Sequence, residues 1–367
     1  MRNIKLHCCI ISTVHPPFDN RIFHKEAKSL VKAGYRVTLI AQHDRHETVN
    51  GVEILPLPKS HNRAARMLKA FVALKLSLEQ RADVYHFHDP ELIPSGLILK
   101  LLGKRVIYDV HEDYPRQVFV KSWIPEYLRK PVSMFVDFFE RISSRLFDGI
   151  IVANDSHKER FPEDRRMVIS NFPSLEYFDE LMKPRESPSE QPVAIYSGLL
   201  SRKRGIGQVV EAFSLLEGVE LWLVGGFEER SFREEIEKKA SSNVRILGIK
   251  PFEEVVTLLR RATIGLSCFL PQPLYLNLVP TKIFEYMAAG IPLVASDFPI
   301  YREYINGCGL LINPQDPEEI AGAVKKLLGN PELMRNMGIE GQRRIKEIYN
   351  WEQEAQKLKG FYQKIMG

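Results

Sequence analysis

Short apolar segments alternate with longer helical patterns along the whole chain, and this alternation constrains the fold more than any other feature. In the first half, the strand-like segments cover residues 4–14, 35–41, 51–57, 83–88, 104–110 and 149–154. In the second half, they cover residues 192–198, 219–226, 243–248, 262–268, 291–296 and 309–313. Strands that alternate with helices form a parallel sheet wrapped by helices, so we predict an α/β protein.

One segment interrupts this rhythm and divides the chain. Residues 173–192 contain four prolines and few apolar residues, which is typical of a linker between domains. We therefore predict a Rossmann-like domain over 1–175, a linker over 176–192 and a second Rossmann-like domain over 193–348. The length of 367 residues agrees with two domains of about 100–200 residues each. Residues 349–367 contain the apolar spacing of an amphipathic helix.

Composition excludes several classes of protein. Apolar residues make up 44% of the chain and charged residues 26%, unlike the composition of a disordered chain. The longest apolar stretches are shorter than the about 20 residues that a membrane-spanning helix needs, and the N-terminus lacks a signal-peptide cleavage site. The four cysteines fit neither a disulfide framework nor a zinc site. We therefore expect a cytoplasmic protein with reduced thiols.

The net charge of +5 is concentrated in one segment. Residues 59–81 hold six Lys or Arg against one Glu, so this segment alone carries the whole excess. Such a local basic face does not indicate a nucleic-acid partner. One helical stripe and a group of cations occur in it: Met67, Phe71, Leu74 and Leu78, with Arg63, Arg66 and Lys69 nearby. Two interpretations remain open, a helix packed on the sheet with a solvated basic side and a helix lying on an anionic membrane surface.

The most informative segment for chemistry covers residues 277–299. Its helix is expected to begin near Pro280 and Thr281, with Lys282 in the first turn. Free backbone N–H groups, the helix dipole and the Lys282 ammonium would together bind an anion such as a phosphate. Glu285, one turn later, would accept hydrogen bonds from a diol such as the two hydroxyls of a ribose. The alternative is that Lys282 and Glu285 form a solvated pair.

A second segment, residues 196–205, links a strand to a helix and contains a cluster of cations. Arg202, Lys203 and Arg204 stand together in its turn, which suits the binding of a diphosphate. The alternative is a solvated run of charge. The glycines match neither the P-loop nor the dinucleotide fingerprint, which argues against a nicotinamide-dependent dehydrogenase.

Histidines follow two strands of the first half. His86 and His88 lie on one face of a strand end and Asp89 follows, so these residues could ligate a metal ion. His111 follows the next strand, in the segment 108–115, and could orient a sugar hydroxyl or transfer a proton. The alternative for His111 is a single histidine with ordinary structural contacts.

These segments, taken in order, resemble glycosyltransferase family 4, a group of retaining enzymes that use nucleotide sugars and have the GT-B fold. The resemblance covers nearly the whole chain and rests on five segments: STVHPPFDNRIFHKEAKSLVKAGYRVTLIA, HFHD, YDVHED, SGLLSRKRG and PTKIFEYMAAGIPLVASD. It implies two Rossmann-like domains that face a cleft, with the nucleotide sugar held by the second domain. It also implies that the terminal helix, which begins near Trp351, crosses back to the first domain.

The resemblance assigns donor-site residues one by one. Glu285 matches the family glutamate that holds the ribose hydroxyls, and Thr281 begins the same helix. Asn277 stands where the family has its other glutamate, which holds hydroxyls of the donor sugar, and its amide can still donate and accept hydrogen bonds. In the phosphate turn, Arg204 replaces the usual lysine and Leu199 the usual arginine.

The remaining site residues follow from the same comparison. Because one cation of the phosphate turn is missing, Lys203 or Lys282 would have to compensate. HPPFDNR replaces the glycine pair of the family's first loop, and Arg21 in it is a candidate donor contact. His111 matches the family histidine that approaches the donor sugar. We expect His111, Arg204 and Lys282 to be catalytic, and we place His88, Asp89 and Asp113 on the acceptor side.

The implied reaction is transfer of a hexose from a nucleotide diphosphate sugar to a glycan or lipid-linked glycan, with retention at the anomeric carbon. It requires neither a metal ion nor another cofactor, and it fits bacterial polysaccharide biosynthesis. The lipid-linked acceptors of similar enzymes favour peripheral contact between residues 59–81 and the inner face of the membrane. The rival interpretations are a metal-dependent hydrolase that uses His86, His88 and Asp89, a degenerate transferase that acts as a non-catalytic partner, and a sugar-nucleotide epimerase.

Overall fold

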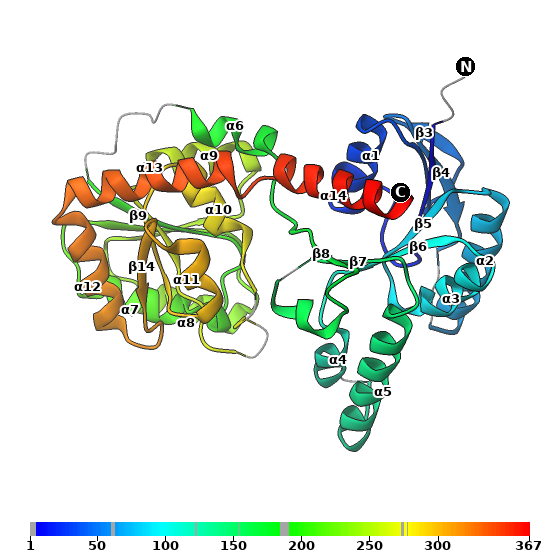
Figure 1. Cartoon of the computed structure of the whole chain (residues 1–367). Helices are drawn as coiled ribbons and strands as arrows, with labels where there is room; N and C mark the ends of the chain where they lie inside the picture. The colour runs from blue at the N-terminus through cyan, green and yellow to red at the C-terminus, as the bar shows by residue number, and fades with distance from the viewer. Residues whose placement is uncertain are drawn as a thin grey trace. The chain divides into compact units, whose positions relative to one another are not determined.

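The chain forms two compact units (Figure 1). Unit 1 comprises the residues up to Asn171 together with Trp351–Gly367, and unit 2 comprises Phe172–Asn350. The computed structural model describes residues 5–59, 63–121, 123–153, 155–183, 191–272, 275–276 and 278–367, with only the backbone described at 63–67, 120, 156 and 157.

Unit 1 is built on an eight-stranded sheet of order β3-β4-β2-β1-β5-β6-β7-β8, in which only β3 runs antiparallel to its neighbour. The strands are β1 His7–Ile11, β2 Arg36–Gln42, β3 Glu47–Val49, β4 Val52–Leu57, β5 Val84–Phe87, β6 Arg105–Val110, β7 Gly149–Val152 and β8 Arg166–Val168. Strands β1, β5 and β7 are buried along their whole length, which explains why their sequences are apolar on both faces.

Helices cover both faces of this sheet. They are η1 Ile22–Ala27, α1 Lys28–Lys32, α2 Arg63–Glu79, η2 Pro90–Leu92, α3 Ile93–Leu101, α4 Tyr114–Gln117, η3 Val118–Val120, α5 Glu126–Ser144, η4 Asp155–Arg160 and α14 Trp351–Met366. Along β1, Cys8 and Ile10 belong to the core shared with η1 and α14, whereas Cys9 and Ile11 belong to the core shared with α2 and α3. The terminal helix α14 therefore completes one core of unit 1.

Unit 2 contains a six-stranded parallel sheet of order β11-β10-β9-β12-β13-β14. Its strands are β9 Val193–Ser197, β10 Glu220–Val224, β11 Val244–Gly248, β12 Ile264–Ser267, β13 Leu293–Ser296 and β14 Gly309–Ile312. Its helices are α6 Leu175–Met182, η5 Arg202–Arg204, α7 Ile206–Ser214, α8 Arg230–Lys239, α9 Phe252–Arg261, α10 Thr281–Ala288, α11 Pro299–Ile305, α12 Pro317–Leu328 and α13 Pro331–Glu347. The predicted α/β class is confirmed.

The predicted linker is wrong over its first part. Residues 175–182 form helix α6, which packs against α9 and α10 of unit 2. The Ser174 hydroxyl caps the helix by accepting from the Tyr177 N–H, and Phe178 and Leu181 are fully buried. The prolines that indicated a linker lie before and after this apolar face, and residues 184–190 lie outside the part of the chain that the structure describes. The border between the units falls at 171, not at 175.

No helix among the described residues has both the length and the apolar character that crossing a membrane requires.

Candidate functional site

The candidate donor site lies at the carboxyl ends of β9 and β10 in unit 2, where two glycines let the backbone segments approach closely. The Gly198 N–H donates to the Val224 carbonyl at 2.8 Å. A Cβ added to Gly225, whose φ is +142°, would lie 1.9 Å from the Gly198 carbonyl oxygen. Only glycine fits at this position. The two glycines therefore leave the backbone at these strand ends uncovered by side chains of their own.

Two cations converge above this bare backbone. A Cβ built on Gly198 would lie 3.2 Å from Lys282 Nζ and 3.4 Å from Arg204 Nη1. Lys282 comes from the first turn of α10, and Arg204 from the turn η5 between β9 and α7. Two positive groups beside a helix N-terminus and an open backbone form a cradle for an anion of diphosphate type.

Lys282 is buried, and its ammonium forms no ion pair with a carboxylate among the described residues. Its side chain is 5% exposed, and within the described part of the chain its Nζ has no hydrogen-bond partner. The ammonium lies 3.4 Å from the centre of the Tyr196 ring, a cation–π contact. Burial first, and then the positive charge of Arg204, hold the Lys282 pKa well below its usual value. A bound anion would supply the missing partner.

The side chains of the three cations in the predicted phosphate turn have three different environments. Arg202 pairs with Glu235 at 2.6 Å and lies over the Phe232 ring. The Lys203 side chain is exposed, and its carbonyl accepts from the Leu270 N–H. Of the three, Arg204 is the one that meets Lys282, so the predicted donor contact of Lys203 has no support in this geometry.

The turn owes its shape to Gly205. Its φ is +73°, and a Cβ there would lie 1.9 Å from the Cys268 carbonyl oxygen. A side chain at this position would push η5 away from the end of β12, and with it the guanidinium of Arg204.

Glu285 follows Lys282 by one helical turn and is half-buried. Burial raises the pKa of its carboxyl group, and the Tyr177 hydroxyl donates to its Oε1 at 2.9 Å. Tyr177 belongs to α6. It was not predicted as a site residue, because this segment was predicted to be a linker. The Thr281 side chain is exposed in the first turn of α10, whereas Asn277 lies outside the described residues.

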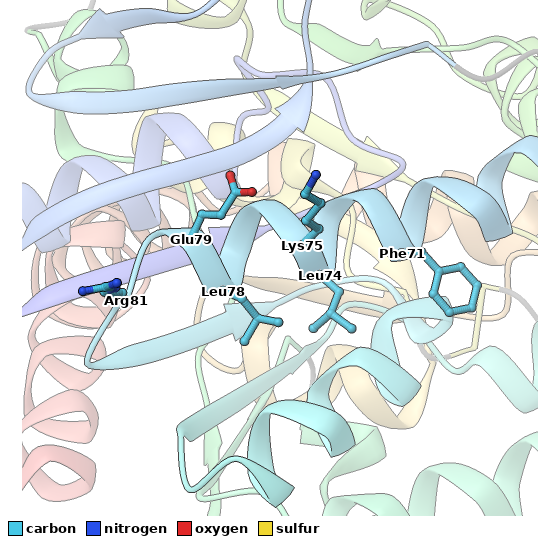
Figure 2. A pocket seen from close by; sticks show the side chains of 6 residues that line it. All are labelled: Phe71, Leu74, Lys75, Leu78, Glu79 and Arg81. Carbon is cyan, nitrogen blue, oxygen red and sulfur yellow. The ribbon is translucent and has the colours of Figure 1, made fainter.

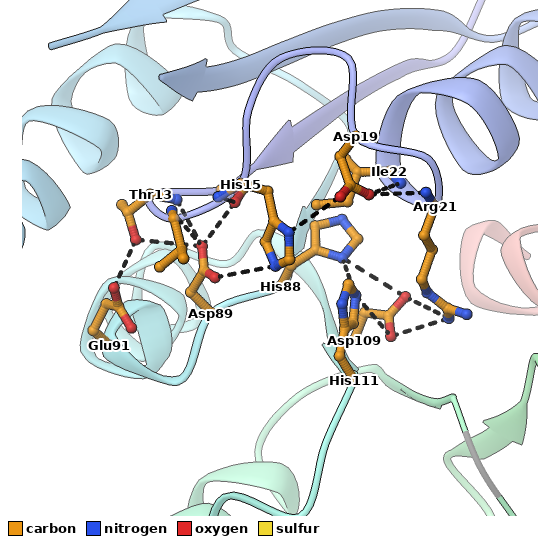
Figure 3. A network of polar contacts seen from close by, with 12 residues as sticks. Thr13, His15, Asp19, Arg21, Ile22, His88, Asp89, Glu91, Asp109 and His111 are labelled. Carbon is orange, nitrogen blue, oxygen red and sulfur yellow. Dashed lines mark hydrogen bonds and ion pairs between the residues drawn. The ribbon is translucent and has the colours of Figure 1, made fainter. Parts of the chain in front are cut away.

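In unit 1, Asp89 holds the loop that follows β1 (Figure 3). Its Oδ2 accepts from the Thr13 N–H at 2.6 Å and from the Ser12 hydroxyl at 2.9 Å. The Thr13 hydroxyl donates to Glu91 at 3.0 Å. Because Asp89 is 2% exposed and its Oδ2 is engaged with this loop, the predicted contact with an acceptor has no support here.

Arg21 is also buried, and its guanidinium pairs with groups inside unit 1 (Figure 3). Its side chain is 4% exposed, with Nη2 3.0 Å from Asp109 and Nε 2.8 Å from Glu26. Its Nη1 donates to the Ile169 carbonyl at 2.9 Å. The predicted donor contact therefore has no support in this geometry, because two buried carboxylates, from η1 and β6, pair with this guanidinium.

His111 is the solvent-facing end of a pair of histidines. His88 is fully buried, and its Nδ1 lies 2.9 Å from Nε2 of His111, whose side chain is 13% exposed. Burial lowers the pKa of His111 to about 4, so its imidazole is neutral near pH 7. A neutral imidazole can exchange hydrogen bonds with a sugar hydroxyl, whereas His88 is fully buried behind its contact with His111.

Two residues beside His111 were missed from the sequence. The His15 ring lies 5.3 Å from the His111 ring, and His15 Nδ1 lies 3.3 Å from Asp19, whose hydrogen bond raises the His15 pKa. Asp19 also accepts from the N–H groups of Arg21 and Ile22. An aspartate just before a helical segment is a typical cap, and this pattern would have identified it.

Asp113 occupies the same end of the sheet but acts within the fold. Its carboxylate caps α4 by accepting from the Arg116 N–H at 3.2 Å. It also lies 3.6 Å from a guanidinium nitrogen of Arg160. Its placement on the acceptor side stays a prediction.

Two family models together match most of the chain. Residues 178–344 match "Glycosyl transferases group 1", and residues 20–174 match "Glycosyltransferase Family 4". A relative, the MMP alpha-(1->4)-mannosyltransferase of Mycolicibacterium hassiacum, is 25% identical over an alignment of 331 residues, which covers 85% of this chain and 76% of the relative.

Solved structures agree at the level of the fold. HepE from Anabaena, in complex with UDP, has a TM-score of 0.72 at 14% identity, covering 98% of this chain and 100% of that one. WaaG, a glycosyltransferase involved in lipopolysaccharide biosynthesis, has a TM-score of 0.63 at 17% identity, covering 96% of this chain and 100% of that one. The chain belongs to glycosyltransferase family 4 and has the GT-B fold.

Proposed function

We propose that this protein is a retaining glycosyltransferase that moves a hexose from a nucleotide diphosphate sugar to a glycan or lipid-linked glycan. The observation that carries the proposal is the convergence of Lys282 Nζ and Arg204 Nη1 on the bare backbone of Gly198. A buried ammonium without a counter-ion is costly unless a ligand pairs with it, and a diphosphate matches both its charge and its position. The UDP bound to Anabaena HepE and the lipopolysaccharide role of WaaG support a nucleotide donor and a role in bacterial polysaccharide biosynthesis.

In the proposed reaction, the bond between the anomeric carbon and the diphosphate breaks while the acceptor hydroxyl attacks from the same face. The acceptor proton passes to the departing diphosphate oxygen, which keeps the configuration at the anomeric carbon. Lys282, Arg204 and the N-terminus of α10 stabilise the negative charge that grows on the diphosphate. Because two cations supply this stabilisation, we propose that the transfer requires no metal ion or other cofactor.

The ribose and sugar contacts are proposed from the surrounding groups. Glu285 would accept hydrogen bonds from the ribose hydroxyls, while Tyr177 fixes one of its oxygens. His111 would exchange a hydrogen bond with a hydroxyl of the transferred sugar, because it is neutral and partly exposed. Thr281 and Asn277 are further proposed contacts of the donor.

A thermal-shift screen against nucleoside diphosphates and nucleotide sugars, with and without EDTA, tests the function. A ligand at 100 times its dissociation constant should stabilise the folded protein by about 2.7 kcal/mol. We expect one nucleotide family to shift the melting temperature, and the shift to survive EDTA. A protein that no nucleotide stabilises would instead be a degenerate partner protein.

Glu285→Gln should weaken the binding of ribonucleoside diphosphates more than the binding of their 2′-deoxy counterparts. The amide keeps one acceptor but loses the charge that strengthens hydrogen bonds to both ribose hydroxyls, a loss of about 1.5–3 kcal/mol. Isothermal titration calorimetry measures both ligands on both proteins. Equal losses for the two ligands would remove Glu285 from the ribose site.

Diphosphate binding should take up a proton. The Lys282 pKa is depressed in the free protein and rises when an anion binds, so between these two values binding protonates the amine. Affinity should therefore fall as pH rises through this window, by at most about tenfold per pH unit. Titration in buffers of different ionisation enthalpy, well above the phosphate pKa of about 6, measures the uptake. The Lys282→Met protein should show none, and uptake that persists in it would come from another group.

We also propose that unit 1 contacts an anionic membrane surface, at the inner face of the membrane. Helix α2 contributes Leu68 and Phe71, which are 67% and 68% exposed, and Lys75. A shallow groove of about 550 Å³ runs beside Phe71 and Lys75 (Figure 2). Lys69 does not join this surface, because its ammonium is buried and donates to the Thr13 carbonyl at 3.2 Å. Arg63 and Arg66 have only their backbone described.

Helix α5 presents a larger apolar face that the sequence did not reveal. Its exposed apolar side chains follow one helical stripe and are Tyr127, Leu128, Met134, Phe135, Phe138 and Ile142. Lys130, Arg141 and Arg145 are exposed on the same segment. An apolar stripe flanked by cations suits a helix that lies in the interface of an anionic bilayer.

Co-sedimentation with vesicles that contain phosphatidylglycerol tests both helices. We expect salt-sensitive binding that falls at least about thirtyfold in the Phe135→Ser/Phe138→Ser protein, since each buried aromatic ring contributes more than about 1 kcal/mol. The matched control is Ile249→Ser, which removes an apolar side chain that is 82% exposed in unit 2. Absence of binding to anionic vesicles would refute the membrane contact.

A further inference from the structure

Four side chains of metal-binding type meet inside unit 1. They are Glu26 of η1, His86 of β5, His88 just after β5 and Asp109 of β6. One ligand atom from each lies within 4.8 Å of all the others. All four side chains are fully buried. We propose that this cluster binds one divalent transition-metal ion, with zinc(II) as the best fit, as a structural site.

The distances suit ligands around a common centre better than direct hydrogen bonds. His86 Nε2 lies 3.6 Å from Asp109 Oδ2, and His88 Nε2 lies 3.7 Å from Glu26 Oε2. Hydrogen bonds between these atoms would measure about 2.7–3.2 Å. Bonds of about 2.0–2.2 Å to a tetrahedral zinc ion place its ligands about 3.3–3.6 Å apart.

Three of the four atoms that face the centre have no hydrogen-bond partner among the described residues, and the fourth, Asp109 Oδ2, accepts from Arg21 Nη2 at 3.0 Å. His86 Nε2, His88 Nε2 and the Oε2 of Glu26 are buried and accept or donate no hydrogen bond. Buried polar atoms without partners are rare, and several in one place call for a common explanation. A metal ion at the centre would satisfy these nitrogens and the Glu26 Oε2 at once.

The outward-facing atoms of the same side chains are held in place. His86 Nδ1 lies 2.8 Å from the Tyr362 hydroxyl, and His88 Nδ1 lies 2.9 Å from His111 Nε2. Arg21 Nε pairs with Glu26 Oε1, the carboxylate oxygen that does not face His88. Outer partners of this kind fix the tautomer of each imidazole and direct its other nitrogen at the metal.

Burial decides what such an ion could do. A catalytic zinc ion keeps one position open to water or substrate, whereas a structural ion is closed by protein ligands. This cluster has no exposed member, so it would tie η1 to β5 and β6 without touching a substrate. The sequence predicted a metal site of His86, His88 and Asp89 in a hydrolase. In the structure, Asp109 and Glu26 join the two histidines, whereas Asp89 Oδ2 accepts from the Thr13 N–H.

The test is metal analysis of the full chain, produced without a polyhistidine tag in medium that contains zinc. We expect about one zinc ion per chain after dialysis. Protein produced with cobalt(II) should show the visible absorption of a tetrahedral site, without the charge-transfer band of a cobalt–thiolate bond. Trace metal content would overturn the proposal. The cluster would then be neutralised by a proton on Glu26, because burial raises the pKa of this carboxyl group. A thiolate band would overturn it in favour of a cysteine site.

Variants locate the ion. His86→Gln and Glu26→Gln should lose the metal, whereas His24→Gln, an exposed histidine on η1, should keep it. Circular dichroism shows which of these proteins are folded. A folded His86→Gln protein with full metal content would place the ion elsewhere and overturn the proposal. If neither cluster variant folds, the cobalt spectrum of the unaltered protein decides.

Discussion

Replacing Lys282 with methionine should lower kcat/KM for sugar transfer by about 10²–10³, while it makes the unliganded protein more stable. Loss of one preorganised positive group that faces the departing diphosphate has this order of effect on rate. In the unliganded protein the same ammonium is buried without a hydrogen bond or ion pair among the described residues, and methionine fills a similar volume without that cost. We expect the free energy of unfolding to rise by about 0.5–2 kcal/mol.

Urea unfolding of the unliganded protein and steady-state transfer assays measure the two effects. Lys203→Met is the matched control, because it removes an exposed cation from the neighbouring turn, and both quantities should stay close to those of the unaltered protein. Unchanged transfer by the Lys282→Met protein would remove this residue from the donor site. A drop in stability would mean that the ammonium has a partner in the unliganded protein.

Replacing Arg21 with methionine should lower the free energy of unfolding by about 3–5 kcal/mol. The substitution leaves Asp109 and Glu26 in the interior without their shared guanidinium, and removing one partner of a buried ion pair has an effect of this size. The affinity for nucleotide should not change in the protein that remains folded. Urea unfolding and calorimetric titration at low temperature separate the two quantities.

Arg36→Met is the control for this experiment. Arg36 also pairs with a glutamate, Glu53, but its side chain is 58% exposed, so the loss should be within about 1 kcal/mol. An Arg21→Met protein of full stability that binds nucleotide weakly would restore the donor contact that the sequence predicted.

The strands were predictable because a strand buried on both faces needs a continuous apolar run. The two strands missed in unit 1, β3 and β8, are three residues long and only partly buried, so their sequences ETV and RMV carry no such pattern. Helix α6 was missed for a different reason. The prolines near it dominate the composition, although Phe178 and Leu181 have the spacing of a buried helical face.

The candidate site was predictable only in part. The residues at the start of the predicted helix indicated Lys282, and the cluster of cations indicated Arg204. That the two side chains lie together above Gly198 depends on how β9, η5 and α10 pack. The environment of Arg21 could not be predicted, because its partner Asp109 lies 88 residues away in β6. Pairing of charges across the fold has no local pattern in a sequence.

The position of α14 has a consequence for how the chain is made. The ribosome completes all of unit 2 before it releases Trp351–Met366, yet Trp351, Leu358, Phe361 and Tyr362 belong to a core of unit 1. The unit that begins first is therefore finished last, whereas domains generally fold in the order of synthesis. Until Tyr362 arrives, His86 lacks its hydroxyl partner, and the core residues that pack against α14 are uncovered. Nascent chains of this protein should depend on chaperones until the final helix emerges.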